Sequence, residues 1–109
     1  MTSSMNCSRN DVVLLPIPFT DLTSRKVRPA IVIGRSGADL FLVPISSQIP
    51  NTDFALKEWR GAGLNVPCGV KAQIATVEEK LVVKIVGVLA AADRQLLNDR
   101  LQSWLQLKA

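Results

Sequence analysis

One arginine and one serine, Arg28 and Ser46, have the residue types and positions to act together on a phosphate. Pro29 restrains Arg28 to an extended backbone at the start of a β-branched segment, so Arg28 opens an expected strand. A guanidinium can donate to two phosphate oxygens, and a serine hydroxyl can donate to the same group. The alternative for Arg28 is a structural arginine at the rim of the sheet, paired with a carboxylate.

A hairpin register brings these two residues side by side. If the strands on either side of Gly37 form a hairpin centred there, paired residue numbers sum to 74 and Arg28 lies opposite Ser46. Directly opposed Cβ atoms in such a ladder are about 5 Å apart. Pro44 favours a bulge or an edge position late in the strand that follows Gly37, and a bulge there would shift the register. A strand that simply becomes polar at its loop is the alternative interpretation of Ser46.

Further polar residues could extend this site, and each also fits an exposed strand face or a solvated loop. Four of the 13 basic residues fall between Arg25 and Arg35, so positive charge is concentrated beside the proposed site. The other candidates are Lys26 in the preceding loop, Ser47 and Gln48 after Ser46, Lys71 and Gln73 on one face of a later segment, and Glu78 and Glu79 at an expected turn.

The elements that must position these residues are a strand-rich body and one late helix. Strands are expected over residues 12–17, 29–35, 40–45, 66–72, 74–77 and 81–89, with one helical turn at 57–60. The second and third strands are apolar on both faces, which predicts central positions in the sheet. Residues 92–107 have helical periodicity, and the apolar face contains Leu97, Leu101, Trp104 and Leu105. We expect a small, mostly antiparallel β-barrel or curved sheet, closed by this helix.

Composition sets limits on the class of protein. The chain has 109 residues, 48% of them hydrophobic, which fits one globular domain and excludes a disordered tail. It has no histidine and only two cysteines, which excludes histidine-based catalysis and a zinc site of four cysteines. The net charge of +4 permits an anionic partner. We expect residues 1–9 to be a loosely ordered polar leader and 10–109 a single domain, in a cytoplasmic protein with two free thiols.

In order along the chain, several blocks resemble those of the MazF/PemK toxin family. The three early blocks are residues 11–21 (DVVLLPIPFTD), 28–33 (RPAIVI) and 43–48 (VPISSQ). The later blocks are residues 56–64 (LKEWRGAGL), residues 70–76 (VKAQIAT) and the expected closing helix. The resemblance spans about residues 10–107, and the blocks together are more specific than any one of them.

The resemblance implies the toxin of a toxin–antitoxin pair that inhibits growth. Such toxins are metal-independent, sequence-selective endoribonucleases with an SH3-like barrel, and they act as homodimers on single-stranded RNA, often mRNA. The family's essential arginine falls on Arg28, and its hydroxyl residue falls on Ser46. RNA contacts are then expected at Thr20, Arg25, Lys26, Ser47, Gln48, Lys71 and Gln73. No cofactor or metal is expected, and the partner is a small antitoxin.

The expected reaction is attack of an RNA 2′-hydroxyl on its own phosphate, leaving a 2′,3′-cyclic phosphate. Because the chain lacks histidine, the candidate proton carriers are Glu78 or another carboxylate, and either one would need a raised pKa. The sequence departs from the family where Ser46 replaces the usual threonine, and where Ala75 replaces an arginine found in some members. Two other functions stay open: a gyrase poison of the CcdB type, acting through helix residues 102–107, and a non-catalytic SH3-like module that binds RNA or protein.

Overall fold

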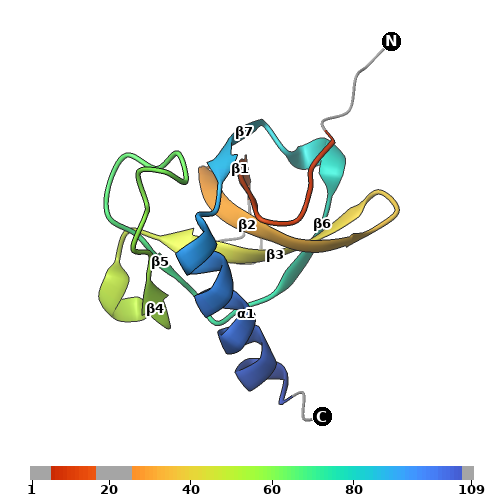
Figure 1. The fold of residues 1–109 in the computed structure, drawn as a ribbon. Helices are drawn as coiled ribbons and strands as arrows, with labels where there is room; N and C mark the ends of the chain where they lie inside the picture. Colours follow the sequence, from red (N-terminus) through yellow and green to blue (C-terminus); the bar gives the residue numbers. More distant parts are fainter. Residues whose placement is uncertain (1–5, 17–25, 107–109) are drawn as a thin grey trace.

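The computed structural model describes residues 6–16 and 26–106, which form a seven-stranded sheet with one C-terminal helix (Figure 1). The elements are β1 (Asp11–Pro16), β2 (Val27–Ser36), β3 (Asp39–Ser46), a 3₁₀ turn (Ile49–Asn51), β4 (Phe54–Ala55), β5 (Gly69–Val70), β6 (Ala75–Glu78), a second 3₁₀ turn (Glu79–Leu81), β7 (Lys84–Val88) and α1 (Ala91–Leu105). The strand order is β4-β5-β3-β2-β1-β7, with β6 paired to β3. The expected β-rich fold with a C-terminal helix is confirmed, and within the described ranges no ladder joins β4 to β7 to close a barrel.

The central strands β2 and β3 are buried on both faces, as their apolar sequences predict. On one face Ile31 and Val43 pack with Leu97 and other apolar residues of α1. On the other face Val32 and Leu42 belong to a second buried cluster. Full burial of each such side chain contributes about 1.5–3 kcal/mol. This two-sided core holds the ends of β2 and β3 in place, and those ends include Arg28 and Ser46.

In the half of the hairpin away from the turn, the numbers of paired β2 and β3 residues add up to the expected 74. Ala30 pairs with Pro44, so the paired numbers sum to 74. Nearer the turn the sum rises to 75, because the register shifts between Val32 and Gly34. The irregularity therefore lies in β2, and the expected bulge at Pro44 is wrong.

Pro44 is accommodated by a gap between two neighbouring ladders. On the side of β3 away from β2, the ladder with β6 ends at Leu42 and the ladder with β5 begins at Ile45. Pro44 lies between them, where its missing N–H breaks no ladder. Its carbonyl accepts a hydrogen bond from the Lys71 N–H at 3.0 Å. Although proline usually weakens a strand, the carbonyl of Pro44 fixes the backbone of Lys71.

Helix α1 packs on the face of the sheet that carries Ile31 and Val43, and Phe54 of β4 and Val70 of β5 belong to the same buried cluster. Leu97 and Leu101 are buried and Trp104 packs against the same cluster, as the helical spacing predicts. Leu105 is 51% exposed and does not join the apolar face, which corrects the expectation. No helix among the described residues is long and apolar enough to cross a membrane.

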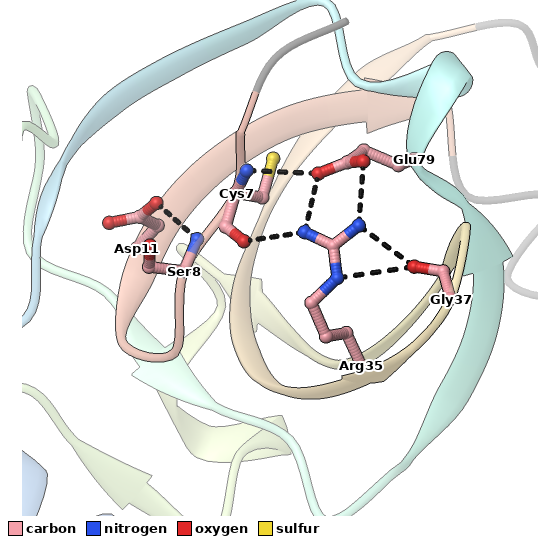
Figure 2. A network of polar contacts seen from close by, with 6 residues as sticks. All are labelled: Cys7, Ser8, Asp11, Arg35, Gly37 and Glu79. Carbon is pink, nitrogen blue, oxygen red and sulfur yellow. Dashed lines mark hydrogen bonds and ion pairs between the residues drawn. The ribbon is translucent and has the colours of Figure 1, made fainter.

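The N-terminal segment is attached to the sheet by an arginine and a glutamate (Figure 2). Glu79 accepts the Cys7 N–H at 2.9 Å and forms an ion pair with Arg35 at 2.8 Å. Arg35 also donates to the backbone carbonyls of Cys7 and Gly37. Cys7, which falls in the expected leader, is buried, and both Cys7 and Cys68 are free thiols. Burial is the main reason that the pKa of the Cys7 thiol rises to about 11.

Candidate active site

A cleft of about 850 Å³ lies where β2 begins and β3 ends. One side is formed by Arg28 and Pro29 of β2 and by the end of β3. The described lining also includes the segment 63–66 and residues 84–86 of β7. We call it the basic cleft, because its described lining contains one arginine, two lysines and no carboxylate.

Arg28 and Ser46 both line the basic cleft. Arg28 and Ser46 each lie two residues beyond Ala30 and Pro44, the last pair of the β2–β3 ladder, so both are at the same end of the hairpin. Arg28 is exposed, and the ion pairs among the described residues involve Arg35, Lys80 and Arg100 instead. The guanidinium of Arg28 is therefore available to an anion that enters the cleft.

The backbone after β3 orients the hydroxyl of Ser46. The Gln48 N–H donates to the Ser46 Oγ at 3.1 Å, a local turn that serine commonly makes with the residue two positions on. Since the oxygen already accepts one hydrogen bond, the hydroxyl hydrogen is the group left to donate to a ligand. The Gln48 side-chain oxygen accepts from Asn51 at 3.1 Å, which holds that side chain at the cleft as well.

Two lysines add to the positive charge of the cleft. Lys71 follows β5 and Lys84 begins β7, and both line the cleft together with Arg28. None of the described lining residues is an aspartate or a glutamate, so these three cations give the lining a net charge of +3. Such a concave site of one sign concentrates anions at its surface.

The cleft contains some of the residues expected at the site and leaves others elsewhere. Ser47, Gln48 and Lys71 line it together with Arg28 and Ser46. Lys26, Gln73 and Glu78 are exposed and lie outside its lining. Thr20 and Arg25 lie outside the described residues. Arg35, counted with the basic residues near the site, lies near the other end of β2 and is held by Glu79.

Glu78 is far from Arg28 and Ser46 along the sheet. It pairs with Asp39, the first residue of β3, whereas Ser46 is the last. Seven residues of strand correspond to roughly 23 Å. Glu78 also forms a surface ion pair with Lys80 at 3.3 Å.

Sequence reasoning missed two residues that line the cleft, Lys84 and Asn65. Lys84 reaches the site because β7 pairs with β1, with Lys84 opposite Leu14. Asn65 reaches it because the segment after the turn at 59–63 folds against β7. The expected helical turn at 57–60 is displaced by one residue: the Ala62 N–H bonds to the Glu58 carbonyl at 3.1 Å, which closes one helical turn that does not continue into a helix. The local sequence around Lys84 or Asn65 gives no signal for these long-range contacts.

Comparisons with protein families and with solved structures place the chain among known proteins. The family of PemK-like, MazF-like toxins of type II toxin–antitoxin systems matches residues 8–105. The chain belongs to this family. The matched range includes every described residue of the toxin that lines the basic cleft. No curated protein sequence matches.

Solved structures share the fold of this toxin. One is an endoribonuclease in complex with its cognate antitoxin from a mycobacterial species, with a TM-score of 0.70 and 20% identity, covering 96% of this chain and 99% of that chain. Another is the Mycobacterium tuberculosis toxin MazF-mt6, with a TM-score of 0.70 and 16% identity, covering 91% of this chain and 99% of that chain. The expected toxin family and fold are confirmed, and the expected enzyme class agrees with the family match and with the first of these structures.

Proposed function

We propose that this toxin is an endoribonuclease that cuts single-stranded RNA, typically mRNA, in the basic cleft. One observation carries the proposal: Arg28 and Ser46 line a cleft whose described lining contains three cations and no carboxylate. RNA offers that site one phosphate per nucleotide. The family match and the solved endoribonuclease of the same fold support the same conclusion.

The proposed reaction is attack of a 2′-oxygen on the adjacent phosphorus. A 2′-oxygen–phosphorus bond forms and the phosphorus–5′-oxygen bond breaks. The 2′-hydroxyl gives up its proton and the departing 5′-oxygen gains one, so the products are a 2′,3′-cyclic phosphate and a 5′-hydroxyl. This chemistry uses a nucleophile that RNA itself supplies, and it requires neither a metal ion nor a covalent enzyme intermediate.

Arg28 has the role of stabilising the negative charge that develops on the phosphate oxygens. Its fork of donors can bind two of those oxygens at once. Ser46 donates its hydroxyl hydrogen to the same phosphate, since Gln48 already occupies one lone pair of its oxygen. Ser46 therefore fixes the phosphate in position while Arg28 stabilises the charge. One such electrostatic donor is typically worth about 3 kcal/mol in the transition state.

Glu78 receives no role in the cleft of its own protomer. The carboxylate lies roughly 23 Å from Ser46 along β3, beyond the reach of a proton transfer. We propose that water exchanges the protons and that stabilisation of the phosphorane by Arg28 provides most of the rate enhancement.

The proposal is tested with purified toxin and a mixed RNA pool in EDTA. We expect cleavage, with 2′,3′-cyclic phosphate ends detected by mass spectrometry. Arg28→Ala should slow cleavage at least about 100-fold. Ser46→Ala should also slow it while RNA binding persists, because the phosphate loses one donor and keeps the cations.

Arg9→Ala is the matched control, because Arg9 is an exposed arginine outside the lining of the basic cleft. It should cleave as the wild type does, and thermal unfolding should show that every variant is folded. Cleavage that depends on added divalent metal, or an Arg28→Ala variant that is folded and fully active, would show the mechanism to be wrong. Gyrase inhibition without RNA cleavage would favour the CcdB-type alternative instead.

The proposed partners follow from the same cleft and from the family. We propose a homodimer that acts in the cytoplasm and a cognate antitoxin whose acidic or apolar segment covers the cleft. Carboxylates of such a segment would pair with the cations that otherwise contact RNA, which would make inhibition competitive. A structural neighbour is itself held in complex with its cognate antitoxin.

A further inference from the structure

The segment 63–66, which we call the wall of the basic cleft, carries a neutral amide, Asn65, on an exposed stretch of backbone. Its side chain offers both a donor and an acceptor, which is the pattern needed to bond the edge of a nucleic acid base. Its neighbours Leu64 and Val66 also line the cleft and present apolar surface, with Val66 49% exposed. The wall therefore has base-binding chemistry, whereas Arg28, Ser46 and the two lysines of the lining have phosphate-binding chemistry.

The wall is held against β7 by a close backbone approach. Gly63 has a φ of +87°, and a Cβ there would collide with the Val86 carbonyl oxygen. Gly87 is equally constrained, since a Cβ there would collide with the Ala62 carbonyl oxygen. Two glycines thus allow the segment before Asn65 to lie directly on β7.

The wall is also anchored from the side of helix α1. Asp93 is completely buried, and its carboxylate accepts the N–H groups of Lys57 and Glu58, both at 2.9 Å. The chain then turns back, and the Leu64 N–H bonds to the Trp59 carbonyl at 3.1 Å. The turn that leads to Asn65 is therefore fixed at its start and at its end.

The segment after Asn65 is fixed as well. The thiol of Cys68 donates to the Val66 carbonyl at 3.2 Å, and Cys68 is buried. The Cys68 carbonyl in turn accepts the Leu56 N–H at 2.9 Å. Asn65 is thus an exposed polar side chain on a backbone that is anchored on both sides. A preorganised amide discriminates between bases better than one that must be ordered on binding.

We propose that Asn65 determines sequence selectivity, by hydrogen bonding the edge of an unstacked base next to the phosphate that Arg28 and Ser46 bind. Single-stranded RNA is recognised through such splayed bases, whose polar edges are bonded and whose faces rest on side chains. Leu64 and Val66 supply the apolar surface for the base face. The inference rests on the proposed function, because it assigns a base-reading role within the same cleft.

The test compares cleavage-site preferences on a randomised RNA pool by sequencing the cut ends. Asn65→Ala should relax the preference at one position about tenfold, as measured from the relative frequencies of the cut ends. Asn65→Asp replaces the amide donor with an acceptor in the same shape, so its preference should move toward a base that presents a donor. Asn98→Ala on α1, outside the basic cleft, is the matched control and should keep the wild-type preference.

The possible outcomes separate this inference from the proposed function. An Asn65→Ala or Asn65→Asp enzyme that cuts with the wild-type preference overturns the inference and leaves the ribonuclease assignment intact. A wild type that cuts at every base equally does the same. A wild type that cuts no RNA overturns both. Because Asn65→Asp preserves side-chain size, it remains informative if the alanine variant is unstable.

Discussion

At the scale of single residues, charge alone does not identify the site. Arg28 and Arg35 belong to one strand and look equivalent in sequence. Arg28 lies at the start of β2 and lines the basic cleft, whereas Arg35 is near the end and is bonded to Glu79 and to the carbonyls of Cys7 and Gly37. One arginine is available to a substrate, and the other fastens the N-terminal segment.

The clamp formed by Glu79 and Arg35 predicts a pH-dependent stability. The hydrogen bond from Arg35 is the main cause that lowers the pKa of Glu79 below its ordinary value, and the Cys7 N–H adds to it. A group with a lowered pKa in the folded state stabilises the fold above its unfolded pKa and loses that effect as the pH falls through the folded pKa. The thermal midpoint should therefore fall between roughly pH 5 and pH 3 more steeply in the wild type than in Glu79→Gln.

At neutral pH, Glu79→Gln should lower the thermal midpoint by about 5 °C or more. Glu78→Gln is the control, because Glu78 is next to Glu79 in sequence but its carboxylate is exposed. Among the described residues, that carboxylate forms a surface ion pair with Lys80. Differential scanning calorimetry across the pH series gives both results. Parallel pH profiles for the wild type and Glu79→Gln would show that the clamp contributes no ionic stabilisation.

At the scale of elements, helix α1 does more than cover the sheet. Asp93 fits the positive end of a helix by sequence, and in the fold its carboxylate bonds to backbone amides of a separate turn. The same turn leads to the wall of the basic cleft, where Asn65 lies. The helix and the site are therefore coupled through one buried carboxylate.

Asp93→Ala should destabilise the protein by about 2 kcal/mol, because two backbone N–H groups lose the buried carboxylate that accepts their hydrogen bonds. Urea unfolding monitored by circular dichroism measures the change. Asp99→Ala on the same helix is the control, since Asp99 is exposed and, within the described part of the chain, its side chain bonds only to Gln95; it should change stability by less than about 0.5 kcal/mol. Equal effects of the two substitutions would remove the anchoring role of Asp93.

At the scale of the whole molecule, the arrangement of charge matters more than the total. The net charge of +4 is modest for a protein proposed to bind and cut RNA. The described lining of the basic cleft has three cations from β2, the segment after β5 and β7, without a carboxylate. The fold thus collects charges from distant parts of the sequence into one anion-binding surface.

Lys84→Gln should weaken RNA binding and its salt dependence together. Each phosphate contact on a single strand contributes about −0.7 to the slope of log affinity against log salt, so the slope should become shallower by about 0.7. Binding is measured with a 2′-O-methyl RNA, which the toxin cannot cleave. Lys80→Gln is the control, because Lys80 is exposed and lies outside the lining. An unchanged slope for Lys84→Gln would exclude a phosphate contact at this lysine.

The sequence by itself determined the parts of this protein that depend on neighbouring residues. Continuous apolar and β-branched runs predicted β2 and β3, and the short turn between them predicted their pairing at Ala30 and Pro44. Arg28 and Ser46 lie just beyond that pair, and both line the cleft. Helical spacing predicted α1 and its buried leucines. These features follow from local periodicity and from one short turn, so the chain needs no distant partner to specify them.

Only the tertiary structure decided which other residues share the site. Lys84 lies at the cleft because β7 pairs with β1, and Asn65 lies there because its segment packs against β7. The sequence predicts a cation near the site at Arg35 and a turn residue at Glu79, and only the fold brings these two residues, 44 positions apart, into one ion pair. Such contacts depend on how distant segments bury a common core, and that packing leaves no local pattern from which a side chain's partner can be read.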